Sequence, residues 1–337
     1  MPIGWGIIGI GAHVRQRIVP ALKKAADTEL VAVCSRSLER AREFAREQET
    51  PHAYDSLAGL LADPAVDVLY VASPNSLHAE QTIQAAEAGK HVLCEKPMAL
   101  TVEDCRRMMD ACRNAGVKLG VDFQNRYHPA HVEARRLIQA GEVGEITLAR
   151  AQYCPPARQG RVQGWKTDPK VAGAGALMGN GLHAIDLLRF LLDSEVTEVV
   201  ARRDPEAADR VEKMVYVMLK FANGVRGIVV AGGQVPRSDN DAVLYGTKAK
   251  ITCQGTVGMP LLGELCVEGE GFNLKMDFPV EDPVSGNYLR VVEAFNRCVR
   301  ENTGPDIPGE IGLQMAVITD AVLESSRSGQ VVELPPK

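Results

Sequence analysis

Two patterns of hydrophobic and polar positions alternate along the first third of the chain. Apolar residues recur every three or four positions, as at Val14, Ile18 and Leu22, which predicts amphipathic helices. Short apolar runs between them predict buried strands, and these lie at 3–8, 29–34, 67–72, 91–94 and 118–121. Strands that alternate with such helices are typical of a parallel α/β sheet covered on both faces.

The pattern changes near residue 123. Asn223-Gly224 is a strong hairpin signal between two strand-like runs, 214–221 and 225–230. Further strands are expected at 241–245, 250–254, 264–268 and 272–278, and helices at 129–140, 182–192, 287–300 and 310–326. We therefore expect two domains, an α/β domain at 1–122 and an α+β domain with an antiparallel sheet at 123–337.

Composition agrees with this division and excludes several partners. The 337 residues correspond to about two domains at ~150 residues each. The net charge of −5 provides no basic field, so neither nucleic acid nor a membrane is expected as a partner. No apolar stretch approaches the ~18 residues of a membrane span. The eight cysteines are scattered without a CxxC pair, which favours reduced thiols and a cytoplasmic location.

A glycine-containing loop joins the first predicted strand to the first helix. In a dinucleotide-binding fold, Gly9 would allow the tight turn and Gly11 would let the backbone approach a pyrophosphate. The usual third glycine is Val14 here, which weakens the match. Glycines in such a turn are often only structural, but the strand–loop–helix context favours dinucleotide binding.

The end of the second strand bears on the choice of dinucleotide. An NAD site usually places a carboxylate there for the ribose 2′-hydroxyl, whereas this chain has Ser35, Arg36 and, one turn later, Arg40. These groups could bind a 2′-phosphate, which predicts NADP(H) rather than NAD(H). The alternative is an ordinary solvated helix start.

Glu95-Lys96-Pro97 follows the fourth strand, at the edge of a parallel sheet where ligands gather. A lysine there could protonate or hydrogen-bond a substrate oxygen. An ordinary surface lysine before a proline turn is the alternative that this spacing leaves open.

Four stretches together resemble the Gfo/Idh/MocA family of NAD(P)-dependent oxidoreductases. They are GWGIIGIGA at 4–12, SPNSLHAEQTIQAAEAGKHVLCEKPMALT at 73–101, NRYHP at 125–129 and GALMGNGLHAIDLLRFLL at 175–192. The segment at 153–169 is similar to the 1,5-anhydro-D-fructose reductase subgroup. The resemblance implies an N-terminal Rossmann domain followed by an α+β domain with a large, mostly antiparallel sheet.

The resemblance also implies an activity and its residues. Hydride would move between nicotinamide and a sugar, polyol or related cyclic alcohol or ketone, in a homodimer or homotetramer. Lys96 and His183 would be catalytic, and a cis Lys96–Pro97 bond is expected. The cofactor-binding positions would be Gly9, Ile10, Gly11, Ala12, His13, Ser35, Arg36, Arg40, Ser73, Pro74, Asn75, His78, Glu95, Lys96, Asp122, Trp165, Lys166 and Tyr288.

The chain departs from the family pattern four residues before His183. The family has an aspartate there, and this sequence has Gly179. Asp186 could orient the histidine instead, although a structural role on its helix is the stronger expectation. The loss of the carboxylate keeps a second hypothesis open: a dinucleotide- or sugar-binding sensor or scaffold with little or no catalysis. Oxidation of a non-sugar alcohol such as a dihydrodiol is a further enzymatic alternative.

Other polar residues give weaker signals. His128, His131 and Glu133 lie close in sequence, but no third convincing ligand is spaced with them, so no metal is expected. Arg126, Trp165 and His183 are candidates for substrate contact. Packing explains Arg126 and Trp165 equally well.

Overall fold

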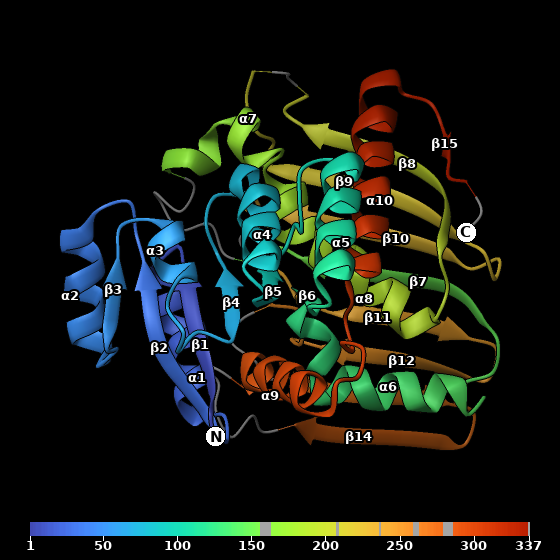
Figure 1. The fold of residues 1–337 in the computed structure, drawn as a ribbon. Helices are drawn as coiled ribbons and strands as arrows, with labels where there is room; N and C mark the ends of the chain where they lie inside the picture. Colours follow the sequence, from blue (N-terminus) through green and yellow to red (C-terminus); the bar gives the residue numbers. More distant parts are fainter. Residues whose placement is uncertain (156–162, 207–208, 236, 259–262, 279–285, 336–337) are drawn as a thin grey trace. The chain divides into compact units, whose positions relative to one another are not determined.

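A computed structural model describes residues 1–155, 163–206, 209–235, 237–258, 263–278 and 286–335 (Figure 1). The chain forms two compact units, Met1–Gln124 with Val284–Ala316, and Asn125–Pro283 with Val317–Lys337. The chain first passes from one unit to the other after Gln124, and we expected a boundary after residue 122. The return of 284–316 to the first unit is a feature that the sequence pattern did not predict.

The first unit contains a parallel sheet of six strands, ordered β3-β2-β1-β4-β5-β6. The strands are β1 (Ile3–Ile8), β2 (Thr28–Cys34), β3 (His52–Tyr54), β4 (Val68–Val71), β5 (His91–Glu95) and β6 (Leu119–Asp122). This is the predicted Rossmann arrangement, and the fold prediction is confirmed. The short edge strand β3 was missed because its three residues are half-exposed and carry no apolar run.

Helices cover this sheet. They are α1 (Val19–Lys24), which continues a π-helical turn at Val14–Ile18, α2 (Leu38–Gln48), α3 (Leu57–Leu61), α4 (His78–Glu87), α5 (Val102–Ala115), α9 (Gly286–Glu301) and the first part of α10 (Gly309–Ser328). Helix α4 packs beside α5, and α1 beside α9 (Figure 1). Ser37 and Thr101 cap α2 and α5 by accepting hydrogen bonds from the backbone N–H groups of Arg40 and Asp104.

Helix α9 belongs to the first unit because of its buried face. Phe295 on that face meets the ring of Trp5 at a centroid distance of 5.9 Å. The indole of Trp5 donates a hydrogen bond of 3.0 Å to Asn296. A Cβ atom at Gly120 would lie 2.8 Å from the Phe295 ring, so the glycine allows the helix to approach β6 closely.

The second unit is built on a sheet of nine strands, ordered β14-β13-β12-β11-β7-β10-β9-β8-β15. These are β7 (Ile146–Tyr153), β8 (Val196–Asp204), β9 (Met214–Phe221), β10 (Arg226–Gly232), β11 (Ala242–Gly246), β12 (Ala249–Gln254), β13 (Gly263–Gly269), β14 (Phe272–Phe278) and β15 (Val332–Glu333). Among the strands that the structure describes in this sheet, only β7 and β10 pair in parallel, so the mostly antiparallel sheet is confirmed. Asn223 and Gly224 form the predicted turn between β9 and β10, with Gly224 at a φ of 89°.

Helices α6 (Pro129–Gln139) and α8 (Leu182–Leu192) pack on this sheet, α8 against β7 and β10 and α6 against β12, β13 and β14. The unit also contains α7 (Pro169–Ala172), a 3-10 turn at Gly164–Thr167 and a π-helical turn at Leu177–Gly181 that leads into α8. None of the helices within the described residues is long and apolar enough to cross a membrane.

Candidate functional site

The loop after β1 has the geometry of a pyrophosphate cradle. Gly9 has a φ of 98°, and a Cβ atom there would lie 2.4 Å from the carbonyl oxygen of Ala72. Only glycine allows this approach between the loop and the end of β4. Gly11, in contrast, faces open space, since a Cβ atom there would touch nothing within 4 Å.

The space over Gly11 lies at the start of the first helix, where exposed backbone N–H groups favour an anion. Strand order reverses between β1 and β4, and nucleotides bind at such a reversal. Gly11, Ala12 and His13 are exposed there, Ile10 is buried, and Val14 packs into the core in place of the usual third glycine. The residues present thus fit a dinucleotide.

Side chains at the end of β2 have the polarity expected for a 2′-phosphate. Ser35 is half-buried, and Arg36 and Arg40 are exposed. Neither guanidinium forms an ion pair with any residue that the structure describes. Asp55 follows the neighbouring strand β3. Burial raises the pKa of Cys34 to about 11, and the negative charge of Asp55 contributes to this increase. One carboxylate therefore lies near this strand end.

The loop after β4 is tied to the Glu95-Lys96-Pro97 segment by His78. This buried ring contacts the carbonyl oxygen of Ser73 through Nε2 at 2.9 Å and that of Pro97 through Nδ1 at 2.8 Å. Burial lowers the pKa of His78, which favours a neutral ring that donates to one carbonyl at a time. The Lys96–Pro97 bond is cis, as expected. His78 thus positions these two loops, and Ser73 and Asn75 are themselves buried.

Four ionisable groups meet at the carboxyl ends of β4, β5 and β6. The hydroxyl of Tyr70 lies 2.7 Å from Glu95 and 2.8 Å from Asp122. Glu95 also contacts His13 Nε2 at 2.7 Å and accepts a hydrogen bond from the backbone N–H of Lys96. Sequence reasoning missed Tyr70, whose place in an apolar strand run gave no polar signal.

The surroundings of Glu95 and Asp122 shift the pKa values of these two carboxyl groups in opposite directions. Burial alone would raise the pKa of Glu95, but His13, Lys96 and Tyr70 outweigh it and lower the pKa to about 2. Burial and the negative charge of Glu95 raise the pKa of Asp122 to about 7. Lys96 itself is half-buried. Tyr288 is buried and packs its ring edge-on against His13, at a centroid distance of 5.3 Å.

His183 lies on α8 in the second unit, where it is 6% exposed. The ring of Tyr153 meets it edge-on at 5.8 Å, and Asn180 donates a hydrogen bond to the Tyr153 carbonyl. Gly179 does not have a positive φ, and a Cβ atom there would touch nothing within 4 Å. The backbone at this position therefore accepts a side chain.

Asp186 is committed to Arg126. The guanidinium donates two hydrogen bonds to the carboxylate, at 2.8 and 2.6 Å, and Arg189 lies 3.5 Å away. Arg126 is only 12% exposed and stacks over Phe190. This pair joins the start of α6 to α8, so the structure gives both residues a structural role.

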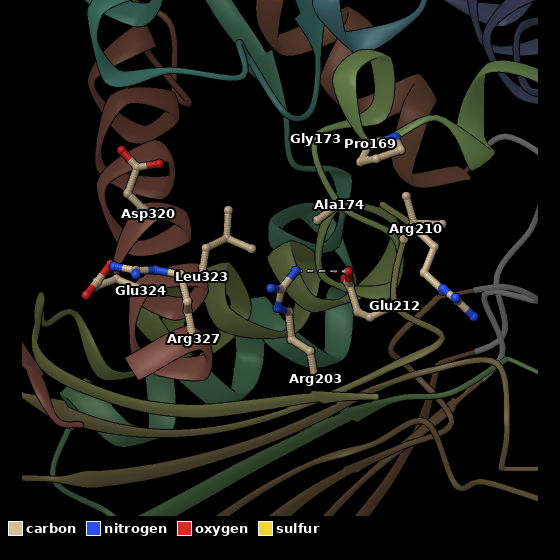
Figure 2. A pocket seen from close by; sticks show the side chains of 11 residues that line it. Pro169, Gly173, Ala174, Arg203, Arg210, Glu212, Asp320, Leu323, Glu324 and Arg327 are labelled. Atoms are coloured by element: carbon tan, nitrogen blue, oxygen red, sulfur yellow. Dashed lines mark hydrogen bonds and ion pairs between the residues drawn. The ribbon is translucent and has the colours of Figure 1, made fainter. Parts of the chain in front are cut away.

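The start of the His183 helix is held by a buried glutamate. Glu212 Oε1 accepts hydrogen bonds from the backbone N–H groups of Gly175 at 3.0 Å and Leu177 at 2.8 Å. Its other oxygen lies 3.6 Å from Arg203. The side chains of Glu212 and Arg203 line a cavity of about 320 Å³ within the second unit (Figure 2). Arg210, Asp320 and Arg327 line the same cavity. None of the predicted site residues lines it.

The remaining candidates lie on the second unit. Trp165 is half-exposed, with the ammonium of Lys166 5.6 Å from its ring centre. His128 caps α6, and His131 contacts the Asn125 carbonyl and the Thr256 hydroxyl, each at 2.7 Å. Both histidines are thereby structural. Within the described residues, no group of three His, Cys, Asp or Glu side chains is arranged to hold a metal ion.

Strand order, the Gly9 turn and the open space at Gly11 together define a protein of the dinucleotide-binding Rossmann class. The chain belongs to the Gfo/Idh/MocA oxidoreductase family. Residues 3–123 match the family described as "Oxidoreductase family, NAD-binding Rossmann fold", and residues 131–252 match its C-terminal domain. The predicted family membership is confirmed. The enzyme class expected from it, an NAD(P)-dependent oxidoreductase acting on CH–OH groups, is also confirmed.

Several characterised proteins are similar along the whole chain. A 1,5-anhydro-D-fructose reductase of Ensifer adhaerens is 32% identical, over 98% of this chain and 98% of that protein. A D-xylose 1-dehydrogenase (NADP(+)) of Haloferax volcanii is 30% identical, over 98% and 99%. The structure of a levoglucosan dehydrogenase with NADH and levoglucosan has a TM-score of 0.88 at 26% identity and covers both chains fully.

Replacing Glu212 tests its role in holding the helix start. We expect Glu212→Ala to lower the free energy of unfolding by about 2–4 kcal/mol, because two buried N–H donors lose their acceptor at ~1–3 kcal/mol each. Glu212→Gln retains an acceptor oxygen and serves as the matched control, with a clearly smaller loss. Urea denaturation measures both. Equal stability of the alanine variant and the wild type would contradict the role.

Proposed function

We propose that this protein is an NADP(H)-dependent oxidoreductase that acts on a sugar, a polyol or a related cyclic alcohol or ketone. The observation that carries the proposal is the carboxyl edge of the parallel sheet. There the tight turn at Gly9 and the open space at Gly11 suit a pyrophosphate, and Lys96 directly follows β5. Relatives named for sugar substrates, at 32% and 30% identity over 98% of the chain, support the substrate class.

When bound, the nicotinamide supplies or accepts the hydride. The ammonium of Lys96 is proposed to hydrogen-bond the reacting oxygen and polarise it. His183 is proposed to exchange the proton of that oxygen as a general acid or base. Arg126 is not carried into this proposal because its guanidinium is bound to Asp186.

The NADP(H) preference rests on Ser35, Arg36 and Arg40 at the end of β2, where a 2′-phosphate would lie. The relatives do not decide it, since one is named for NADP(+) and one solved structure contains NADH. Trp165, Lys166 and Tyr288 remain proposed cofactor-side residues, and Trp165 a proposed substrate contact.

We also propose a homodimer or homotetramer in the cytoplasm. Among the described residues, the large hydrophobic side chains exposed on the nine-stranded sheet are Tyr216 and Met218 on β9, Ile228 on β10 and Tyr245 on β11, with exposures of 37–56%. Met218 and Ile228 are direct cross-strand partners. A patch of this kind is typical of an interface between subunits.

Cofactor preference is tested by binding. We expect NADPH to bind roughly ten- to hundredfold more tightly than NADH, because charge-assisted contacts contribute ~1.5–3 kcal/mol. A variant with both Arg36→Ala and Arg40→Ala loses this difference and keeps its NADH affinity. Arg42→Ala, an exposed arginine on the same helix, is the control. Fluorescence titration measures the dissociation constants, and equal values in the wild type would refute the preference.

Lys96 is tested by removing its ammonium group. We expect Lys96→Met to bind NADPH normally and to turn over ~10²–10⁴-fold more slowly, the usual cost of losing an acid–base group. Steady-state kinetics beside an NADPH titration separate the two effects. A variant that reacts at the wild-type rate would remove Lys96 from catalysis.

His183 and Gly179 are tested together. His183→Ala should reduce turnover by ~10²-fold or more and leave NADPH affinity nearly unchanged. Gly179→Asp fits without strain, because the backbone φ is not positive and a Cβ atom meets open space. It should raise activity or shift the pH profile if its carboxylate pairs with His183.

The substrate panel for these assays includes aldoses, ketoses and a dihydrodiol. The dihydrodiol is included because one relative 30% identical over 89% of the chain is named a trans-1,2-dihydrobenzene-1,2-diol dehydrogenase, from Danio rerio. If NADPH binds but nothing reacts, even in the Gly179→Asp variant, the protein is a dinucleotide-binding sensor rather than an enzyme.

A further inference from the structure

One tyrosine hydroxyl in the first unit lies between two carboxyl groups. Tyr70 is fully buried, and its oxygen is 2.7 Å from Glu95 Oε1 and 2.8 Å from Asp122 Oδ2. A hydroxyl has a single hydrogen, so it donates to only one of them. The other contact is a hydrogen bond only if that carboxyl group carries a proton and donates it to the tyrosine oxygen.

The surroundings of the two carboxyl groups identify which one is protonated. Glu95 has three donors around it: the ring of His13, the backbone N–H of Lys96 and the hydroxyl of Tyr70. Asp122 is 1% exposed, and among the described residues its Oδ1 has no hydrogen-bond partner. An ionised Asp122 would thus be buried with one bare oxygen, which is costly, whereas a neutral acid is not.

The elements packed around Asp122 offer little compensation for a negative charge. On the neighbouring strands stand Glu95, Lys96 and Tyr70, and His13 comes from the glycine loop. His78 on α4 contacts the Ser73 and Pro97 carbonyls, and burial lowers its pKa, which favours a neutral ring. Helices α9 and α10 meet β6 through Phe295 against Gly120 and through Gly309 and Gly312 against Leu119 and Val121, so these contacts are apolar.

The position of Asp122 relates this proton to the cofactor. In a doubly wound sheet, the β1–β3 half binds the adenosine part of the dinucleotide and the β4–β6 half binds the other nucleotide. Asp122 and Glu95 end adjacent strands of the second half. The oxidised nicotinamide ring carries a positive charge and the reduced ring does not, so the two forms differ in their effect on a nearby acid.

We propose that Asp122 is a neutral acid in the free protein and in its complex with reduced cofactor, and that binding of oxidised cofactor expels its proton. This inference rests on the proposed function. Asp122 thereby distinguishes the two redox states: higher pH favours binding of the oxidised form, and lower pH favours the reduced form.

The hydrogen-bonded groups provide an exit for the proton. Asp122 passes its proton to the Tyr70 oxygen, Tyr70 passes its own to Glu95, and Glu95, whose side chain is 14% exposed, releases one to water while His13 keeps its Nε2–H hydrogen bond to the carboxylate. His13 has a side-chain exposure of 41% and is the end of the chain of contacts nearest solvent. The balance is one proton released for each oxidised cofactor bound, with no electron transferred and no bond other than O–H and N–H bonds changed.

Titration calorimetry at pH 6, in two buffers of different ionisation enthalpy, counts this proton. The quantity to compare is proton release with NADP⁺ minus proton release with NADPH. The 2′-phosphate, with its pKa of about 6, is present in both forms and cancels in this difference. We expect a difference close to one proton at pH 6, falling toward zero above pH 8. The dissociation constant for NADP⁺ should decrease up to about tenfold per pH unit until about pH 7 and then level off.

Asp122→Asn is the decisive variant. Its amide can donate to Tyr70 like the neutral acid but has no proton to release, so the difference in proton release, measured with each cofactor at saturation, should vanish. Asp110→Asn, an exposed acid on α5, is the matched control and should behave like the wild type. Infrared difference spectra of the wild type should show loss of a protonated carboxyl band on NADP⁺ binding, absent from Asp122→Asn.

The outcomes separate this inference from the proposed function. Tight binding of both cofactors with no difference in proton release overturns the role of Asp122 and leaves the dinucleotide site intact. A difference that survives in Asp122→Asn overturns it equally. Absence of binding by either dinucleotide overturns both proposals, and in that case circular dichroism of the wild type shows whether the protein was folded.

Discussion

The close approach of Gly9 to the end of β4 is the contact on which the first unit's site depends. A side chain at Gly9 would lie 2.4 Å from the Ala72 carbonyl, so the chain can leave β1 and enter the first helix only through a residue without Cβ. This turn sets where the helix begins, and with it the exposed N–H groups that favour a pyrophosphate. It also brings His13, four residues on, to Glu95 at the end of β5.

The second consequence is a concentration of ionisable groups at one sheet edge. Parallel strands bring all their carboxyl ends to the same side, so Tyr70, Glu95 and Asp122 converge although they lie 25 to 52 residues apart. Their environment then divides them. His13, Lys96 and Tyr70 lower the pKa of Glu95, while burial and the negative charge of Glu95 raise the pKa of Asp122 to about 7. Paired acids with opposite protonation are a recurring means of handling protons in enzymes.

Local patterns in the sequence were sufficient to predict much of this fold. The period of apolar positions marks β1, β2, β4, β5 and β6, and the Asn223-Gly224 turn marks the β9–β10 hairpin. Strands β7 and β8 were not predicted, because small or charged residues such as Ala149, Ala151 and Arg202 interrupt their apolar runs. The return of α9 to the first unit depends on tertiary packing of Phe295 and Asn296 against Trp5, which no local pattern encodes.

The site residues also divide into those that a local sequence pattern predicts and those that depend on tertiary packing. The glycine loop and the Glu95-Lys96-Pro97 segment are contiguous and therefore visible in the sequence. The Arg126–Asp186 pair joins residues 60 apart, and the Glu212 contacts with Gly175 and Leu177 span 37 and 35. Their roles become evident only when strand order and helix packing are known.

Hydride transfer is the central claim, and isotopic labelling tests it most directly. The wild-type protein is incubated with NADPH deuterated at the transferred C4 position and a panel of ketoses and aldoses, and the products are analysed by mass spectrometry. We expect an alcohol product that contains one deuterium at the former carbonyl carbon. Tight NADPH binding with no deuterated product from any carbonyl compound would contradict it.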